Sequence, residues 1–426
     1  MKIFFITLTI FLYTGISATN AQTPMKFAFG SGKAATGFTQ VRASDIYTKE
    51  RGYGFEPGAE IKCSAIGGKT ASGFCTSEKP FYFSAAVPEG NYRITVTFGD
   101  KKEATATTVK AELRRLMLEK VETAKGKFTQ KSFIVNIRNP QISTGGEVKL
   151  KDREKTSEAW AWDEKLTLEF NNSRPTIDSI VIEKVNVPTI FLLGDSTVTD
   201  QPGEPYASWG QMLTAFFAPE IAIANNAESG ESLRSSLGAK RLDKVLSVLQ
   251  KDDYVLIQYG HNDEKEKGEN VGAMTTYKAS LKKYIETIRA KDGNPVLITP
   301  MHRRTFDENG KITNSHGDYL EAVRQAAQEE NVPLIDLAEM SKKFYEALGK
   351  EKSGAAFKEG DATHHSSYGA YELAKMIVEG IKTENLPIAE YLIKGLPKFD
   401  PNKPDLFENF AVPVSPTTPT AKPLGS

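Results

Sequence analysis

The chain has 426 residues, which is enough for two domains with separate hydrophobic cores. Its 54 basic and 54 acidic residues balance, so no net field attracts it to nucleic acid or to an anionic membrane. The composition therefore excludes functions that depend on a large net charge.

The first 21 residues have the pattern of a secretory signal peptide. Lys2 supplies the positive charge, residues 3–16 are mostly apolar, and Thr19-Asn20-Ala21 is a small-residue cleavage site. The alternative is a transmembrane anchor, but the apolar run is short and threonines interrupt it. We expect an exported protein, periplasmic or secreted, whose mature chain begins at Gln22.

Cys63 and Cys75 are the two cysteines of the chain. In an oxidising compartment they could form a disulfide, and closing so short a loop contributes about 3 kcal/mol. Two separate buried thiols are the alternative. The spacing is not a zinc-binding pattern, and the first histidine is His261, so the cysteines predict no metal site.

Residues 22–187 have the pattern of an antiparallel β-sandwich domain. Short segments of alternating apolar and polar residues are separated by clusters of Gly, Pro and Asn. Residues 109–121 are ambiguous, because their composition favours a helix whereas a sandwich requires a strand. The clearest predicted strands are residues 92–98, 133–137, 166–170 and 178–185.

Residues 188–394 alternate between strands and helices. The strands are apolar along their whole length, which predicts a parallel sheet covered by helices on both faces, an α/β/α domain. The predicted strands are residues 191–193, 221–225, 254–258, 296–299 and 333–336. The predicted helices are residues 207–217, 240–250, 277–290, 319–330 and 366–382.

The tail, residues 395–426, is rich in proline and cannot continue the regular packing. We expect Phe399, Leu406 and Phe410 to pin its first part to a domain surface. Residues 411–426 are expected to be disordered.

Ligands of parallel α/β sheets bind beyond the carboxyl ends of the strands. Ser196, Gly230, Asn262 and His302 each follow a predicted strand, so they should converge on one edge of the sheet. Ser196 stands in Gly194-Asp195-Ser196, where a buried strand stops at a glycine and leaves the hydroxyl open for attack. The tripeptide alone is also common in ordinary turns, so the downstream residues decide its interpretation.

A serine hydrolase also needs a histidine base backed by a carboxylate. Among five histidines, His364 has a carboxylate at short spacing, Asp361, just before the closing helix that Ser366 can cap. His365 is the competitor, and we interpret it as a surface residue at the helix start.

Donors for an oxyanion follow two other strands. The Asn262 amide is a neutral donor at a strand end, and Gly230 lets a backbone N–H approach the substrate. His261 with Asp263 suggests a metal site, but no third ligand stands at a suitable spacing. We predict no metal and no cofactor.

These segments match, in order, the four sequence blocks of the SGNH (GDSL-type) hydrolases: Gly194-Asp195-Ser196, Gly230, residues 260–263 and residues 361–364. The chain resembles the rhamnogalacturonan acetylesterase branch of that family over residues 188–382. Supporting segments are residues 206–211, 301–306, 316–319 and 364–370. The N-terminal half is similar to galactose-binding-like β-sandwich modules fused to such esterases, and it would either bind polysaccharide or complete the catalytic cleft.

The resemblance implies that Ser196 is the nucleophile, His364 the general base and later the general acid, and Asp361 the residue that orients it. It also implies an oxyanion hole made by the backbone N–H groups of Ser196 and Gly230 and by the Asn262 amide. One position departs from the pattern, because many relatives carry Arg after the block-two glycine whereas this chain has Glu231. Arg234 is the candidate to compensate for it.

Four residues are candidates for substrate binding. Arg303 and Arg304 follow a strand at the same edge and suit a uronic acid carboxylate, although solvated loop charges are an equal alternative. Tyr206 could stack on a sugar, whereas the spacing of Trp209 favours the core. Arg234 completes the set.

The sequence therefore predicts an exported serine esterase that removes acetyl groups from a pectic plant polysaccharide, with rhamnogalacturonan favoured, and that binds neither nucleic acid nor membrane. One rival is the same machinery acting on acetylated xylan or on a lipid or thioester. The rival from another class is a polysaccharide-binding protein without activity.

Overall fold

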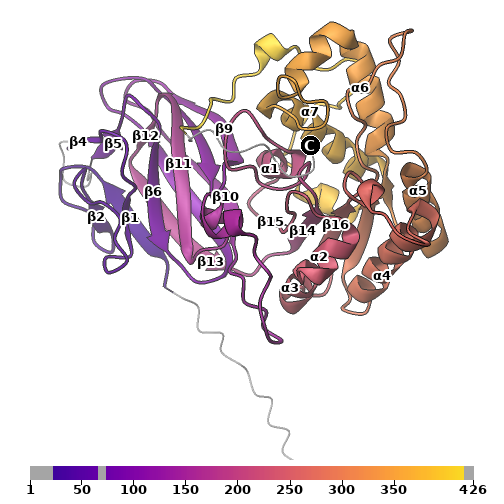
Figure 1. Cartoon of the computed structure of the whole chain (residues 1–426). Coiled ribbons are helices and arrows are strands. Elements are labelled where there is room, and N and C mark those ends of the chain that lie inside the picture. The colour runs from indigo at the N-terminus through magenta and orange to yellow at the C-terminus, as the bar shows by residue number, and fades with distance from the viewer. Residues whose placement is uncertain (1–22, 66–72, 417–426) are drawn as a thin grey trace, which may run out of the picture.

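The computed structural model describes residues 23–65 and 73–416. The expected signal peptide and the last ten residues of the tail lie outside this range. Figure 1 shows the β-rich N-terminal half on one side and the α/β C-terminal half on the other. Within the described residues, no helix is long and apolar enough to cross a membrane.

The N-terminal half is the predicted sandwich. Two five-stranded sheets, ordered β10-β7-β13-β1-β2 and β3-β6-β11-β8-β9, enclose a core to which both contribute aromatic residues, such as Phe27 and Phe83 with ring centroids 5.2 Å apart. Pairing is antiparallel except between β1 and β2. A small third sheet has the order β12-β5-β4.

The strands of the two large sheets are β1 (Met25–Phe29), β2 (Thr39–Val41), β3 (Tyr53–Phe55), β6 (Phe81–Ala86), β7 (Gly90–Gly99), β8 (Thr105–Ala111), β9 (Arg115–Thr123), β10 (Phe128–Ile137), β11 (Lys165–Arg174) and β13 (Ser179–Val185). The third sheet contains β4 (Lys62–Ser64), β5 (Phe74–Thr76) and β12 (Thr176–Ile177). A disulfide joins Cys63 to Cys75 across β4 and β5, so the paired alternative is the correct one.

The ambiguous segment 109–121 is a hairpin of β8 and β9 rather than a helix. Its tight turn places Glu112 and Arg114 at positive φ, 55° and 63°. Burial between the two sheets outweighs helix propensity, because propensity differences are small beside the apolar area that a sandwich strand buries.

The C-terminal half is a five-stranded, all-parallel sheet ordered β15-β14-β16-β17-β18. Successive residues of a strand enter different cores: Ile190 and Leu192 join one apolar cluster, whereas Phe191 and Leu193 join the other. Both faces are therefore buried, as the apolar strands predicted. The strands are β14 (Thr189–Gly194), β15 (Ala222–Asn225), β16 (Tyr254–Gln258), β17 (Asn294–Ile298) and β18 (Leu334–Ile335).

Helices cover the two faces of this sheet. The first cluster holds residues of α1 (Trp209–Leu213), α6 (Leu337–Lys352) and α7 (Ser367–Thr383). The second holds residues of α2 (Leu233–Gly238), α3 (Arg241–Val248), α4 (Lys278–Arg289) and α5 (Tyr319–Glu330). The sequence did not predict α2 and α6, and the predicted helix 207–217 is the short α1 followed by a 3-10 turn, η3 (Thr214–Phe216).

The tail is ordered further than expected. Phe399 and Phe410 pack against the core, but Leu406 is 54% exposed. The prediction of disorder is wrong for residues 411–416, because the buried Lys110 ammonium donates to the Pro413 carbonyl at 2.6 Å and the Ser415 hydroxyl at 2.7 Å. A charged group of the sandwich thus holds the tail in place.

The β8–β9 hairpin connects the two domains. The Arg114 guanidinium donates to the carbonyls of Gln201 and Tyr206 at 3.1 and 2.9 Å. Leu116 is fully buried and belongs to the apolar cluster of the α/β domain. The sandwich therefore supplies part of the second domain's core.

We expect Asp200→Asn to destabilise the folded protein by about 3 kcal/mol. The Asp200 carboxylate lies 3.0 Å from the Arg115 guanidinium, and both side chains are at most 2% exposed, so the variant leaves a buried charge across the interface unpaired. Arg115→Met in the same chain should recover part of the loss. The free energies of unfolding of both single variants and the double variant measure this coupling, and strictly additive losses would contradict it.

Candidate active site

The candidate nucleophile follows the central strand directly. β14 ends at Gly194, where an added Cβ would lie 2.5 Å from Val198 Cγ2 and 2.7 Å from the Gln258 carbonyl oxygen, so only glycine fits. The backbone N–H groups of Val198 and Thr199 donate to the Asp195 carbonyl at 3.1 Å and close the turn. This turn places Ser196 at the carboxyl edge of the sheet.

Three residues from distant parts of the chain form a hydrogen-bonded line. Ser196 Oγ lies 2.8 Å from His364 Nε2, and His364 Nδ1 lies 2.9 Å from Asp361 Oδ2. All three are at least nine-tenths buried. The geometry is that of a nucleophile, a base and an orienting carboxylate.

The local turn fixes the histidine. Asp361 Oδ1 accepts hydrogen bonds from the backbone N–H groups of Thr363 and His364, at 2.8 and 3.1 Å. Burial would raise the pKa of the Asp361 carboxyl, but the His364 ring and these N–H groups outweigh it and hold the pKa far below its ordinary value. The carboxylate therefore stays ionised behind His364. The following helix α7 begins as predicted, with the Ser366 hydroxyl accepting from the Gly369 N–H.

A second buried network of hydrogen bonds holds the turn that carries Ser196. Asp195 Oδ1 accepts from the N–H and the hydroxyl of Thr197, and Asp195 Oδ2 lies 3.3 Å from His261 Nδ1. Gln258 links Thr197 to the Trp209 indole N–H. Burial opposes ionisation of Asp195, yet His261 and the Thr197 donors lower its pKa. Trp209 is thus a core residue, as its spacing favoured.

The candidate oxyanion donors lie on neighbouring loops. Gly230 has φ +77°, in the left-handed region that favours glycine. One hydrogen of the Asn262 amide donates to the Glu231 carbonyl at 3.0 Å, and the amide has a second hydrogen to donate. Asn262 is therefore held by the loop that carries Gly230.

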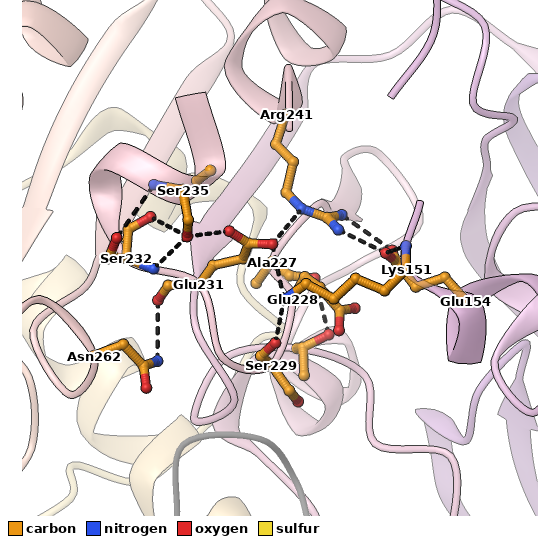
Figure 2. Close-up of polar contacts among 12 residues, drawn as sticks. Lys151, Glu154, Ala227, Glu228, Ser229, Glu231, Ser232, Ser235, Arg241 and Asn262 are labelled. Atoms are coloured by element: carbon orange, nitrogen blue, oxygen red, sulfur yellow. Dashed lines mark hydrogen bonds and ion pairs between the residues drawn. The ribbon is translucent and has the colours of Figure 1, made fainter. Parts of the chain in front are cut away.

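Glu231, which departs from the family pattern, is 2% exposed. Its carboxylate lies 2.9 Å from Lys151 Nζ and accepts from the Ser235 hydroxyl, so its partners are protein groups (Figure 2). Arg234, the proposed compensating residue, is 56% exposed at its side chain and pairs with Glu266 at 3.3 Å.

The other predicted substrate-binding residues have protein partners of their own. Arg303 forms an ion pair with Glu264, and Arg304 donates to the Ser353 hydroxyl at 2.9 Å. Tyr206 is 6% exposed, and its ring stands edge-on to His364 with centroids 6.0 Å apart. Tyr206 was expected to be freer than Trp209, but it forms part of the wall around the base.

His365 is not the surface residue that we predicted. It is 1% exposed, and its Nε2 lies 2.7 Å from the Tyr345 hydroxyl. The segment Phe357 to His365 pairs back on itself, which turns this ring into the core. His302 follows β17, as expected, and its ring lies beside that of His316 with centroids 6.1 Å apart.

His261 and Asp263 were the residues that suggested a metal site. Among residues 23–65 and 73–416, no three His, Cys, Asp or Glu side chains are placed to hold a metal ion. Asp263 instead accepts from the Leu233 N–H at 2.9 Å, and burial raises its pKa to about 8.

Sequence reasoning missed the residues that hold the site from outside its motifs. Gln201 donates to the Ser196 carbonyl at 2.7 Å, while Lys151 and Arg153 of the sandwich domain reach the loop of Gly230. The contacts of Lys151 and Arg153 could not be predicted, because no motif spacing relates residues 151–153 to residue 230.

The geometry is that of a serine acyl hydrolase on an α/β/α sheet, and comparison with known proteins places it in a family. Residues 192–370 match the GDSL-like Lipase/Acylhydrolase family. Residues 25–144 match the Beta-agarase/YXIM esterase-like, galactose-binding domain-like family. The chain therefore belongs to the GDSL-like lipase/acylhydrolase family and is a carboxylic ester hydrolase.

Three relatives come from Bacillus subtilis. Rhamnogalacturonan acetylesterase RhgT is 38% identical over 219 residues, which cover 48% of this chain and 94% of RhgT. Probable rhamnogalacturonan acetylesterase YesY is 42% identical over 48% of this chain and 97% of its own length. Uncharacterized esterase YxiM is 26% identical over 91% of this chain and 98% of its own. The crystal structure of YxiM covers 85% of this chain and 99% of its own, with 25% identity and a TM-score of 0.47.

We expect Asn262→Ala to lower kcat about a hundred-fold, because removing one oxyanion donor costs this much in other acyl hydrolases. Hydrolysis of nitrophenyl acetate measures the effect. Asn226→Ala is the matched control: it removes a buried amide just after β15, which β14 separates from β16, and that amide donates to the Ala224 carbonyl, so kcat should be unchanged. A kcat within threefold of wild type for Asn262→Ala would remove this residue from the oxyanion hole.

The contribution of three buried histidines to the free energy of unfolding should decrease as the pH falls from about 6.5 to 4, whereas buried carboxyls such as Asp263 contribute with the opposite sign. Burial lowers the pKa of His261 and His302 from 6.5 to about 4 and that of His365 to about 3. In this range these histidines bind protons in the unfolded chain but not in the folded protein, so their contribution to stability is complete above pH 6.5 and is lost toward pH 4. His302→Gln should reduce the slope by up to one proton in urea titrations at several pH values, and an unchanged slope would contradict the assignment.

Proposed function

We propose that this protein is an exported carbohydrate esterase that removes O-acetyl groups from pectic polysaccharide, with rhamnogalacturonan as the favoured substrate. The observation that carries the proposal is the line from Ser196 through His364 to Asp361 at the carboxyl edge of the sheet. The names of RhgT and YesY support the substrate class. The amino-terminal pattern of residues 1–21 supports export.

In the proposed first step, Ser196 Oγ attacks the acetyl carbonyl carbon while His364 Nε2 accepts the hydroxyl proton. The negative charge that develops on the carbonyl oxygen is stabilised by the N–H groups of Ser196 and Gly230 and by the Asn262 amide. Asp361 stabilises the imidazolium through Nδ1. The C–O bond to the sugar then breaks, and the sugar oxygen takes the proton from His364.

The second step releases acetate. A water molecule gives a proton to His364 Nε2 and attacks the acetyl carbon bound to Ser196 Oγ. The second tetrahedral intermediate collapses, the proton returns to Ser196 Oγ, and acetate leaves. The same three donors serve both steps, since the oxyanion forms on the same carbonyl oxygen.

The uronate role of Arg303 and Arg304 is part of this proposal. Each guanidinium has five N–H donors. Arg303 directs three of them to Glu264 and to the His261 and Ser315 carbonyls, and Arg304 directs two to the Ser353 hydroxyl and the Lys350 carbonyl, so each retains donors. Both arginines lie after β17 at the carboxyl edge, which is the edge that carries Ser196. A substrate carboxylate at this edge would find bidentate partners.

Acetate release from acetylated rhamnogalacturonan and from acetylated xylan, measured side by side, tests the proposal. We expect release from the pectic substrate and none from Ser196→Ala, which loses the attacking oxygen while a small buried side chain preserves the fold. Activity retained by Ser196→Ala would refute the mechanism.

Each substrate outcome has its own meaning. Release from xylan alone would preserve the mechanism and remove the uronate role of Arg303 and Arg304. Cleavage of nitrophenyl acetate without release from either polysaccharide would assign the machinery to another acyl substrate. Binding to immobilised pectin with no hydrolysis at all would favour the non-enzymatic alternative.

A further inference from the structure

A loop of the sandwich domain reaches the loop that carries Gly230. We define the brace loop as residues 151–158, which contain the 3-10 helix η1 (Asp152–Lys155), and the oxyanion loop as residues 227–231. Figure 2 shows the Lys151 side chain of the brace loop reaching Ser229 and Glu231 of the oxyanion loop, and Glu154 facing Arg241. The two loops are joined by hydrogen bonds and ion pairs, so the contact is polar and directional.

Two cations of the brace loop converge on one carbonyl oxygen. Lys151 Nζ donates to the Ser229 carbonyl at 2.7 Å, and Arg153 Nη2 donates to the same oxygen at 2.6 Å. Arg153 also forms an ion pair with Glu228. The Ser229 carbonyl therefore accepts two charge-assisted hydrogen bonds, which are stronger than hydrogen bonds between neutral groups.

That carbonyl belongs to the same peptide group as the Gly230 N–H. A trans peptide is planar, and its C=O and N–H point in opposite directions, so fixing the oxygen fixes the direction of the N–H. Cationic donors on the oxygen also polarise the amide and make its N–H a stronger donor. We propose that Lys151 and Arg153 are positioning residues for the reaction: they orient and polarise the Ser229–Gly230 peptide so that the Gly230 N–H stabilises the oxyanion.

The same loop contact also fixes the second donor. The Glu231 carboxylate is held by Lys151 Nζ at 2.9 Å, by Arg241 Nε at 3.7 Å and by the Ser235 hydroxyl. With the side chain of Glu231 anchored, its backbone carbonyl is in place to accept from the Asn262 amide. Lys151 therefore supports both the Gly230 N–H and the Asn262 amide.

The brace loop is itself rigidly attached to the α/β domain. Both Glu154 oxygens accept from the Arg241 guanidinium, at 3.1 and 2.7 Å, and these side chains are at most 1% exposed. Glu154 also accepts from the Lys151 backbone N–H at 2.8 Å, which sets the start of the brace loop. Because the brace loop is anchored in this way, it can hold the Ser229–Gly230 peptide in one orientation, which a mobile loop could not do.

This arrangement explains the residue at position 231. The basic groups that face Glu231 are Lys151 of the sandwich domain and Arg241 of α3, and an acidic residue at position 231 complements both. The sandwich domain thus completes the catalytic cleft in this proposal, which was one of the two roles expected for it. The inference rests on the proposed function of Gly230 and Asn262 as oxyanion donors.

The test compares Lys151→Met and Arg153→Met in the full chain with nitrophenyl acetate as substrate. We expect each variant to lower kcat about ten-fold, less than the loss of a whole donor, with KM within about twofold. Affinity for phenylboronic acid, which forms a tetrahedral adduct with the nucleophile, should weaken by the same factor. Arg153→Lys should restore part of the rate, because its ammonium can still donate to the Ser229 carbonyl.

Lys244→Met is the matched control. Lys244 also crosses the domain interface, where it donates to the Gln141 carbonyl at 2.5 Å and pairs with Glu89 at 2.6 Å, but it does not contact the oxyanion loop. Its kcat and boronic acid affinity should equal those of wild type, although its melting temperature is expected to fall. A loss of kcat in Lys244→Met equal to that in Lys151→Met would show general interface damage and overturn the proposal.

Lys151 and Arg153 side chains are 28% and 21% exposed, so their replacement is compatible with folding, which circular dichroism checks. Lys151→Gln provides a second variant that removes the charge but keeps a shorter polar side chain, and it should lose several-fold in kcat. If these variants retain the kcat and the boronic acid affinity of wild type, the proposal that Lys151 and Arg153 position the Ser229–Gly230 peptide is wrong. Full nitrophenyl acetate activity in Ser196→Ala would instead refute the proposed function, so the two failures are distinguishable.

Discussion

The buried guanidinium of Arg241 is the constraint on which the joint between the two domains depends. A charge removed from water must be paired, and at this position the first residue of α3 finds both oxygens of Glu154, which belongs to the other domain. Burial opposes the charged state, yet Glu154, Glu228 and Glu231 together raise the pKa of Arg241 above its ordinary value. The pair therefore ties the sandwich to α3, and Arg241 also contacts Glu231 in the loop that carries Gly230, at 3.7 Å. Neither domain can move away without leaving a buried charge unpaired.

The parallel sheet imposes the second constraint. Its strands all end at one edge, so the turns after β14, β15 and β16 must lie close together even though the residues between them fold into helices on either face. Gly194 makes the first of these turns tight enough to present Ser196. The histidine arrives from a fourth segment, the turn before α7, where a three-residue spacing lets Asp361 bind both the backbone and the ring of His364. Fold and site are therefore consequences of the same strand order.

The fold class and the members of the Ser196, Asp361 and His364 line could be predicted from the sequence, because each depends on local pattern or short spacing. Strand alternation and helix periodicity are local, and Asp361 and His364 are three residues apart. Residues 109–121 were ambiguous and His365 was assigned to the surface, because burial in both cases is decided by distant partners. The order of residues 411–416 depends on Lys110, about three hundred positions earlier, and no local composition could indicate it.

The sequence by itself determined the class of the protein: a sandwich joined to a parallel α/β sheet, with the residue types of a serine esterase placed after the strands. Short motifs carry this information because a strand-ending glycine turn or a helix cap involves neighbouring residues. Only the tertiary structure decided how the sandwich takes part in the site. Lys151 and Arg153 meet the Ser229 carbonyl across some 75 residues of chain, and Glu231 is complementary to them only once the domains have docked. Contacts of this kind leave no periodicity or spacing in the sequence, since they form only where the two domains pack against each other.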